Sequence, residues 1–257
     1  MSLRLFDSHS HLDAPEFDED RDQVLARARI VGVDEQLVPA VDRAGWPALK
    51  QLCANQAGLY PAYGLHPMYL DQHQPAHLAA LRQWIEQEHP PAIGECGLDF
   101  FVEGLDAGVQ RLYFNGQLEL AREFDLPLVI HARRSVEEVI LSLRRIGGLR
   151  GIVHSYSGSE EQARLLVDMG FLIGIGGPVT YERARRLQRL AKELPIESLV
   201  LETDAPDQPG SSHRGQRNEP AHLLEVLIAV ARLRDCEQSD LAEATRSNMR
   251  RLLRLAN

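Results

Sequence analysis

The sequence predicts an α/β fold of the (β/α)8 TIM barrel class, and two observations indicate it. Short apolar runs of strand length recur along the chain, and each is followed by a longer stretch in which apolar residues repeat at helical spacing. Strict alternation of this kind implies parallel strands joined by right-handed crossovers. Eight such units within 257 residues favour a closed barrel over an open sheet.

Each predicted strand is a run of apolar residues bounded by polar, glycine or proline residues. The first lies within residues 3–13, where Leu3, Leu5 and Phe6 precede a polar stretch. The others, in chain order, are residues 35–41, 59–65, 92–96, 126–130, 151–153, 171–175 and 198–201.

Amphipathic stretches between these runs are predicted as helices. Pro47 suits the first turn of one helix, and Gly147 and Gly170 follow two others where a C-terminal cap is expected. The predicted helices are residues 17–31, 46–56, 77–88, 109–124, 136–146, 160–169 and 181–194, and, beyond a polar loop at 207–218, residues 221–233 and 240–255.

The composition is that of an ordinary globular protein, with 44% hydrophobic and 25% charged residues. No linker, low-complexity tract or charge block divides the chain, so we expect residues 1–257 to form a single domain. The net charge of −9 has the wrong sign for broad adhesion to nucleic acid. A polyanionic substrate would therefore be attracted locally, by a metal or a small arginine cluster.

Targeting signals are not visible in the sequence. No apolar run approaches the roughly 18 residues of a membrane span, and no basic segment followed by an apolar core begins the chain. The cysteines Cys53, Cys96 and Cys236 are too few and too widely separated for a disulfide framework or a thiolate zinc site. We therefore expect a cytoplasmic protein without membrane contact.

Two histidines follow the first predicted strand. His9 and His11 are spaced at i and i+2, and side chains at this spacing point to the same side of extended chain. Burying two adjacent imidazoles without hydrogen-bond partners is energetically unfavourable, but the pair is well suited to bind a divalent metal ion. A single His-x-His pair occurs by chance in many proteins, so its significance depends on the residues at the ends of the other strands.

Further metal-capable residues occur at the ends of four later strands. Glu95 lies on the fourth strand, and His131, His154 and Asp204 lie at the ends of the fifth, sixth and eighth. In a parallel barrel these ends meet at the face that carries the active site. Each residue alone has a plain structural explanation, such as a hydrogen-bonded loop histidine, a capping glutamate or an Asx turn. Their convergence at one face favours a metal site.

Six ligands are too many for one tetrahedral ion and suit a binuclear pair of divalent ions. Zinc, manganese and magnesium are all compatible with four imidazoles and two carboxylates. Such a site is locally cationic, which favours an anionic substrate such as a phosphoester. We interpret Cys96 as a packing residue. The remaining histidines are expected to be solvated: His73, His77, His89, His213 and His222.

Several segments resemble the signature blocks of the TatD family of metal-dependent deoxyribonucleases, whose barrels are of the amidohydrolase type. These segments, with Gln117, are DSHSHLD (7–13), YGLHP (63–67), GECGLDF (94–100), PLVIHAR (127–133), VHSYSGS (153–159), LETDAP (201–206) and RGQRNEP (214–220). The resemblance covers nearly the whole chain in order. It implies a metal-dependent hydrolase that cleaves DNA phosphodiester bonds.

The resemblance also implies roles for individual residues. One ion would be held by His9, His11, Glu95 and Asp204, and the other by Glu95, His131 and His154, so that Glu95 bridges the two. Asp204 would also orient or deprotonate the attacking water. His66 and Arg133 would contact the scissile phosphate. Three residues depart from the usual pattern of the family: Cys96, Tyr156 and Arg134.

Additional substrate contacts are suggested by residue type. Arg214 and Arg217, on the polar loop after the eighth strand, could bind flanking phosphates as well as Arg133, although a solvated loop is an equal interpretation. The aromatic residues Tyr69, Phe100 and Phe101 follow the third and fourth strands and could stack a base. We interpret Phe101 as a packing residue.

The sequence therefore predicts a deoxyribonuclease with two divalent ions, acting exonucleolytically on single-stranded DNA. An alternative is an amidohydrolase that cleaves an amide, ester or lactone in the same site. A carbamylated lysine bridge is not expected, because neither Lys50 nor Lys192 follows a strand. A second alternative is a non-catalytic metal-binding protein. The presence of a complete set of candidate ligands argues against it.

Overall fold

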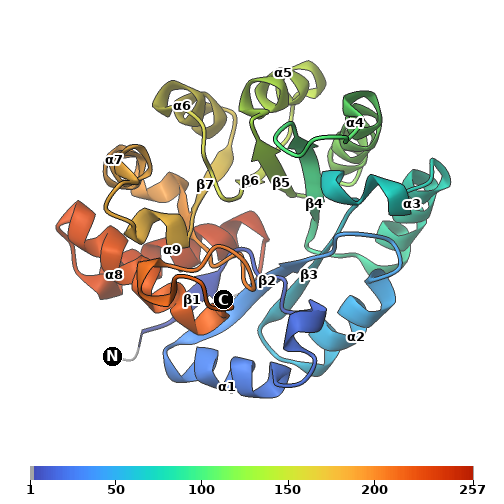
Figure 1. Cartoon of the computed structure of the whole chain (residues 1–257). Coiled ribbons are helices and arrows are strands. Elements are labelled where there is room, and N and C mark those ends of the chain that lie inside the picture. Colours follow the sequence, from blue (N-terminus) through green and yellow to red (C-terminus); the bar gives the residue numbers. More distant parts are fainter. Residues whose placement is uncertain (1–2, 257) are drawn as a thin grey trace.

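The centre of the molecule is a sheet of eight parallel strands in the order β1 to β8, surrounded by helices (Figure 1). This computed structural model describes residues 3–256. The topology is that of the predicted (β/α)8 TIM barrel. Its strands are β1 Leu5–Asp7, β2 Val33–Pro39, β3 Leu59–Tyr63, β4 Ala92–Asp99, β5 Leu128–Arg133, β6 Gly151–Val153, β7 Phe171–Ile175 and β8 Leu199–Leu201.

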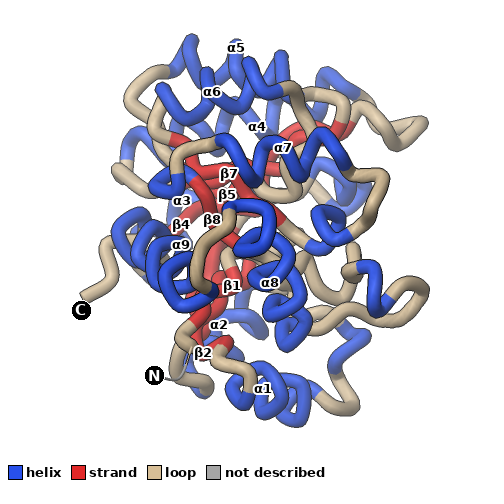
Figure 2. The backbone as a smooth tube through the Cα atoms, turned by 90° about the vertical axis from the view of Figure 1, so that its left-hand side faces the viewer, coloured by secondary structure: helices blue, strands red, loops and turns tan. Residues whose placement is uncertain are grey.

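Helices connect consecutive strands on the outside of the sheet, and the tube view shows the strands enclosed between them (Figure 2). The α-helices are α1 Arg21–Ile30, α2 Trp46–Asn55, α3 Ala76–Glu88, α4 Ala107–Glu123, α5 Val136–Ile146, α6 Glu160–Asp168, α7 Arg185–Glu193, α8 Leu223–Arg234 and α9 Gln238–Leu252. None of the described helices combines the length and apolar character required to cross a lipid bilayer.

The first and last strands meet just beyond their ends. The Ser8 amide donates to the Leu201 carbonyl at 2.9 Å, and the Asp204 amide donates to the His9 carbonyl at 2.9 Å. These bonds bring the histidines that follow β1 next to the carboxylate that follows β8. The closure of the barrel therefore also assembles part of the metal-capable cluster.

The barrel interior is a small apolar core to which every strand contributes one residue. Met249, Leu252 and Leu253, near the end of α9, complete this core, so α9 closes one end of the barrel. The strand residues are Phe6, Leu37, Ala62, Ala92, Val129, Ile152, Leu172 and Val200.

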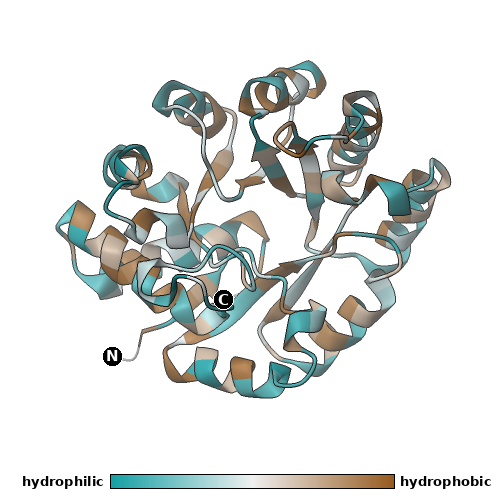
Figure 3. Ribbon diagram, in the orientation of Figure 1, coloured by the Kyte–Doolittle hydropathy of each residue, from teal (hydrophilic) through white to brown (hydrophobic). Residues whose placement is uncertain are grey.

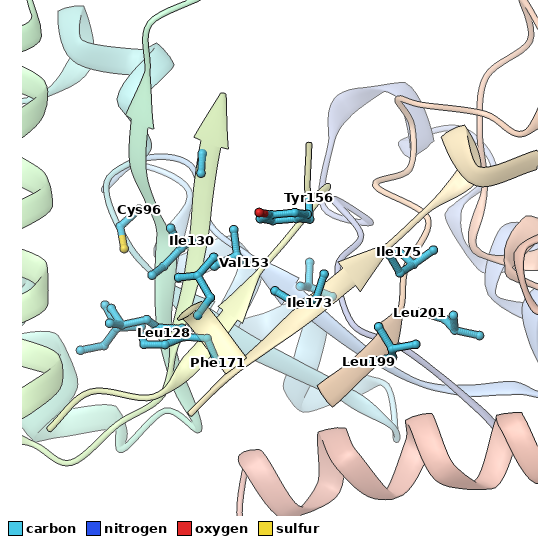
Figure 4. Packing of buried hydrophobic residues seen from close by; sticks show 14 of the residues in the cluster. Cys96, Leu128, Ile130, Val153, Tyr156, Phe171, Ile173, Ile175, Leu199 and Leu201 are labelled. Carbon is cyan, nitrogen blue, oxygen red and sulfur yellow. The ribbon is translucent and has the colours of Figure 1, made fainter. Parts of the chain in front are cut away.

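A larger core lies between the strands and the surrounding helices. The residues that alternate with the interior layer, such as Ile130 on β5 and Ile173 on β7, belong to it (Figure 4). Hydrophobic residues accordingly concentrate in the strands and along the helices, whose other positions are hydrophilic (Figure 3). Cys96 is fully buried in this core, as expected of a packing residue.

Some predicted boundaries are wrong by several residues. The fourth strand continues to Asp99 instead of ending at Cys96, because Gly97 to Asp99 pair with His131 to Arg133 of β5. His131 consequently lies within β5 and does not follow it. The predicted helix at 181–194 begins only at Arg185, because residues 181–184 form a turn in which the Ala184 amide donates to the Tyr181 carbonyl at 2.9 Å.

Candidate metal centre

Two of the candidate ligands lie directly above the interior apolar layer. His131 is two residues beyond Val129 on β5, and His154 is two residues beyond Ile152 on β6. Because alternate residues of a strand share a face, both imidazoles point into the barrel mouth. Both are largely buried. The packing that fills the barrel therefore also sets the direction of these side chains.

Glu95 reaches the same mouth through an irregularity in β4. Ile93 pairs with Leu128 and Cys96 with Ile130, so β4 has one residue more than β5 over this interval and contains a bulge. In a regular strand Glu95 would share the outward face of Ile93. The extra residue reverses the alternation, so that Glu95 points inward while Cys96 packs outward.

Glycines on both sides of Glu95 permit this backbone path. Gly94 and Gly97 have φ of 146° and 150°, which other residues rarely adopt. A Cβ at Gly97 would collide with the carbonyl of His131, and a Cβ at Gly94 would lie 2.7 Å from the Val129 carbonyl oxygen. The GECG segment is thus required for the close approach of β4 to β5.

One oxygen of Glu95 faces the histidines that follow β1. Glu95 Oε2 lies 3.1 Å from His9 Nε2 and 3.4 Å from His11 Nε2. Asp204 Oδ1 lies 3.4 Å from the same His9 nitrogen. Oε2 is buried and accepts no hydrogen bond from any of residues 3–256. A buried carboxylate oxygen in this position is costly unless a cation binds it.

The other oxygen of Glu95 faces a different set of imidazoles. Glu95 Oε1 lies 2.9 Å from His66 Nε2, 3.1 Å from His131 Nδ1 and 2.7 Å from His154 Nε2. His154 also stacks on His9, with ring centroids 3.9 Å apart. The two oxygens of one carboxylate thus divide the cluster into two halves.

Hydrogen bonds on the far side of each ring indicate which nitrogen can bind a metal. His11 Nδ1 lies 3.3 Å from the Pro39 carbonyl oxygen, which only accepts, so Nδ1 carries the proton and Nε2 is free for a metal. His66 is the opposite case. Its Nδ1 accepts from the Met68 amide at 3.2 Å, so its Nε2–H donates to Glu95. His66 therefore suits contact with a carboxylate or phosphate better than metal ligation.

In this cluster, burial and the neighbouring charged groups shift the pKa values in opposite directions. Burial would raise the pKa of Glu95, but the neighbouring His66, His154 and His9 hold it well below its ordinary value. Burial lowers the pKa of His9 to about 4. For His11, burial is outweighed by the nearby carboxylates of Glu95 and Asp204, which raise its pKa to about 9. An ionised carboxylate among imidazoles is the donor set that divalent transition metals prefer.

The residues present fit divalent ions. Three groups of donor atoms each lie within 4.8 Å of one another, and neighbouring groups share His9 or Glu95. Sharing of donors is expected where two ions lie close together. Among residues 3–256 the groups are His9, His154 and Asp204; His9, His11 and Glu95; and His66, Glu95 and His131, in which His66 meets the distance but donates its Nε2 hydrogen to Glu95.

Comparison with known proteins agrees with this geometry. The model of the family described as TatD related DNase matches residues 6–254, which is nearly the whole chain. The chain belongs to the TatD family. The resemblance seen in its sequence motifs is therefore confirmed.

Relatives and solved structures of the TatD family cover the chain from end to end. It is 37% identical over 251 residues to an uncharacterized metal-dependent hydrolase, YjjV, of Escherichia coli strain K12, covering 96% of this chain and 97% of that one. The crystal structure of YjjV, a TatD homologue, superposes with a TM-score of 0.95 at 35% identity over 100% of both chains. A Klebsiella pneumoniae protein named 3'-5' ssDNA/RNA exonuclease TatD is 32% identical, covering 96% of this chain and 97% of its own.

These findings make the chain a metal-dependent hydrolase of the TatD family with His, Asp and Glu side chains placed to bind metal. Membership of the family also confirms that the chain is an enzyme that acts on ester bonds. The number and identity of its ions are addressed below as a proposal.

Asp99 is a supporting residue of the TatD site that sequence reasoning missed. Its Oδ2 lies 2.9 Å from His131 Nε2, and its Oδ1 accepts from the amides of Phe101 and Val102 at 2.8 and 3.0 Å. Burial opposes its ionisation, but the hydrogen bond from His131 and those of the two amides lower its pKa to about 2. Because a carboxylate only accepts, His131 carries its proton on Nε2 and presents Nδ1 to the cluster. Asp99 belongs to the segment GECGLDF (94–100), but nothing in that segment indicates that its side chain contacts His131.

Two buried acids support the closure of the barrel and were also missed. Asp7 accepts from the Thr203 amide at 3.0 Å and from the Thr203 hydroxyl at 2.6 Å, and burial raises its pKa to about 7. Glu202 accepts from the Ser155 amide, and burial raises its pKa to about 8. Both follow apolar strand residues, a signal that sequence reasoning used for the ligands but not for these acids.

Gln208 holds one side of Asp204. Its Nε2 donates to Asp204 Oδ2, while its Oε1 accepts from the Ser155 hydroxyl at 2.8 Å. Asp204 Oδ1 remains directed at His9. A cavity of about 430 Å³ opens beside Gln208 and is lined in part by Ser155, Tyr156, Arg183 and Leu187.

The predicted substrate-binding arginines occupy different surroundings. Arg133 is exposed at the end of β5, two residues beyond His131 and on the same face of the strand. Arg214 is exposed on the loop after β8. Arg217 forms two bonds of 2.8 Å to Asp20 and one of 2.6 Å to the Glu16 carbonyl oxygen, so three of its N–H donors are engaged within the protein.

Two of the interpretations for other side chains are wrong. His73 and His77, expected to be solvated, are buried, and His73 Nε2 lies 2.9 Å from the His66 carbonyl oxygen. Phe101, interpreted as a packing residue, is 44% exposed, and its ring contacts two arginines. Helical or strand spacing does not reveal these environments, because His73 contacts the backbone of His66 and His77 lies on the buried side of α3.

Proposed function

We propose that this chain is a deoxyribonuclease that hydrolyses phosphodiester bonds of single-stranded DNA from one end, using two divalent ions. The observation that carries the proposal is the division of Glu95, whose two oxygens face separate histidine sets. A bridging carboxylate is the natural centre of a two-ion site, and two-ion sites are suited to displacement at phosphorus. The name of the Klebsiella relative, a 3'-5' ssDNA/RNA exonuclease, supports the same substrate class.

Each ligand has a place in this scheme. His9, His11, Glu95 and Asp204 would hold one ion, and Glu95, His131 and His154 the other. Ions bound there would be zinc, manganese or magnesium, and would supply Lewis acidity for activation of water and for the negative charge of the phosphate.

Asp204 orients the attacking water and accepts its proton. Gln208 donates to Oδ2 and so fixes the carboxylate plane, while Oδ1 faces the cluster beside His9. His66 presents an N–H toward the cluster and Arg133 presents its guanidinium at the rim, and both would contact the scissile phosphate. Arg214 would bind a flanking phosphate, whereas Arg217 would first have to exchange Asp20 for the substrate.

The test is hydrolysis of end-labelled single-stranded DNA by chelated protein and by protein resupplied with magnesium, manganese or zinc. We expect nucleotide release that requires metal and falls by at least about a hundredfold in Asp204→Asn, as is typical when a group that activates the nucleophile is lost. Asp235→Asn is the matched control, because Asp235 is exposed at the end of α8 in a left-handed conformation that Asn tolerates.

The position of the label in the products gives the polarity, and a parallel RNA substrate shows whether the sugar matters. Protein that binds two ions but releases nothing from DNA or RNA under any metal would contradict the proposal. Amide, ester and lactone substrates would then test the amidohydrolase alternative, and their failure as well would favour a non-catalytic metal-binding protein.

A further inference from the structure

Two consecutive arginines pack on one exposed aromatic ring at the rim of the metal centre. The guanidinium carbon of Arg133 lies 3.7 Å from the centroid of the Phe101 ring, and that of Arg134 lies 4.6 Å from it. We refer to Phe101, Arg133 and Arg134 as the arginine clasp. It joins the loop after β4 to the end of β5.

Backbone conformation explains why both arginines reach the same ring. Consecutive residues of a strand point to opposite faces, so Arg134 should point away from Arg133. Arg134 has a φ of 55°, in the left-handed region that non-glycine residues adopt infrequently. This turn at the end of β5 brings the second guanidinium back to Phe101.

The clasp is tied to the metal centre through a single carboxylate. Asp99 accepts from the Phe101 and Val102 amides with one oxygen and holds His131 with the other. His131 is also two residues before Arg133 on the same strand. The positions of the Phe101 ring and of both guanidinium groups are therefore coupled to that of His131, a proposed metal ligand.

The donors of the clasp are free. A guanidinium that packs by its face on an aromatic ring keeps its N–H groups, which lie in the guanidinium plane, available for a ligand. The exposed guanidinium groups of Arg133 and Arg134 form no hydrogen bond or ion pair with any of residues 3–256, and their only described contact is with the Phe101 ring. Arg27 and Arg217, by contrast, pair with carboxylates. Two uncompensated cations side by side, in a chain of net charge −9, indicate a site for a ligand with more than one negative charge.

We propose that Arg134, held on Phe101 beside Arg133, binds the phosphate adjacent to the scissile one. The ligand class is thus a nucleic acid strand with at least two phosphates within reach of the clasp. Arg134 would contribute to affinity for the strand and not to the chemical step. This inference rests on the proposed nuclease function and adds a second phosphate position to it.

The first measurement is binding of fluorescein-labelled (dT)12 by anisotropy, in EDTA so that no turnover occurs, at several salt concentrations. We expect Arg134→Gln to weaken binding about fivefold and to reduce the slope of log K against log salt by about 0.7, the contribution of one single-strand phosphate contact. Arg144→Gln is the control with the same charge change, since Arg144 is exposed in the last turn of α5. Its slope should match the wild type.

The second measurement is metal-supplied hydrolysis of (dT)12 and of the dinucleotide dTpdT, which has only the scissile phosphate. We expect Arg134→Gln to raise KM severalfold on (dT)12, to leave kcat within about twofold and to have no effect on dTpdT. Phe101→Leu, which removes the ring under both guanidiniums, should raise KM on (dT)12 further, while Phe101→Tyr should behave as wild type.

Equal loss in Arg134→Gln and Arg144→Gln, or an equal effect on (dT)12 and dTpdT, would overturn the inference while the nuclease proposal stands. Binding of (dT)12 that depends on Arg134, without hydrolysis under any metal, would instead overturn the nuclease proposal and leave the phosphate site intact. Wild-type protein that neither binds (dT)12 in EDTA nor hydrolyses it with any metal would contradict both.

Discussion

At the scale of single residues, the orientation of the ligands depends on groups that do not contact the ions. Asp99 fixes the His131 ring through its Nε2, and the Pro39 carbonyl does the same for His11 through its Nδ1. Each bond selects the tautomer that leaves a lone pair directed at the cluster. The division of Glu95 between two histidine sets would be lost if these rings could rotate.

Asp99→Asn should therefore weaken metal binding. The amide cannot replace the charge that orients His131, and loss of such a partner typically costs 10- to 100-fold in metal affinity. Competition between the protein and a chromophoric zinc chelator measures the change. Asp106→Asn is the control, because Asn preserves the N-cap that Asp106 provides to α4. Unchanged zinc affinity in Asp99→Asn would show that His131 is oriented by packing alone.

The three thiols should differ in reactivity. Cys236 is exposed, whereas Cys96 is buried, and burial raises the pKa of Cys53 to about 12. Because the thiolate is the reactive form, only Cys236 should react quickly with a disulfide reagent near pH 8. The time course should show one fast thiol and two that react only after addition of denaturant, and Cys236→Ser should abolish the fast phase. A second fast thiol in the folded wild type would contradict the raised pKa of the partly buried Cys53.

At the scale of elements, the N-terminal cap of a helix contributes to stability close to the metal centre. α6 begins with a capping box, in which Ser159 accepts from the Gln162 amide at 3.2 Å and the Gln162 side chain accepts from the Ser159 amide at 3.0 Å. The segment before this cap carries His154. The helix start and the metal centre are thus only a few residues apart.

Ser159→Ala should destabilise the protein by about 1 kcal/mol, the usual cost of losing a serine N-cap. Urea unfolding followed by circular dichroism measures the change. Ser239→Ala, at an exposed position inside the first turn of α9, should change the free energy of unfolding by less than about 0.5 kcal/mol. The capping interpretation fails if the two variants are equally stable.

At the scale of the whole molecule, the two ends of the barrel differ in chemistry and in role. One end carries the polar cluster, and the other is closed by α9, whose Met249, Leu252 and Leu253 complete the interior core. Arg246 and Arg250 of the same helix form ion pairs with the buried Glu35 of β2. We propose that residues 1–257 form one domain, since the last helix completes the core begun by the first strand.

Met249→Ala should lower the free energy of unfolding by about 2–5 kcal/mol, because it leaves a cavity in a core to which all strands contribute. Denaturant unfolding should still show a single transition, with its midpoint shifted. Met68→Ala removes a methionine that is 41% exposed and should have little effect on stability. Separate transitions for α9 and for the rest of the chain would contradict the single domain.

Much of the fold and part of the site could be predicted from the sequence. The spacing of apolar residues, together with bounding glycines and prolines, distinguishes the strands from the helices. Because a parallel barrel places the strand ends at one face, the sequence predicts that His131, His154 and Asp204 converge. Both inferences rest on local spacing and on a topology that leaves few alternatives. The family resemblance further assigned these residues to a TatD-type site, and the comparisons confirm the family.

Other features were decided only by the tertiary structure. Alternation along β4 would have pointed Glu95 outward, and only its pairing with β5 shows the bulge that turns it in. Likewise Asp99 became a partner of His131, and Arg134 a partner of Phe101, because β4 and β5 lie side by side. Sequence periodicity reports which face a residue prefers along its own element. Register, bulges and contacts across elements depend on how neighbouring backbones pair, and that is determined only when the barrel closes.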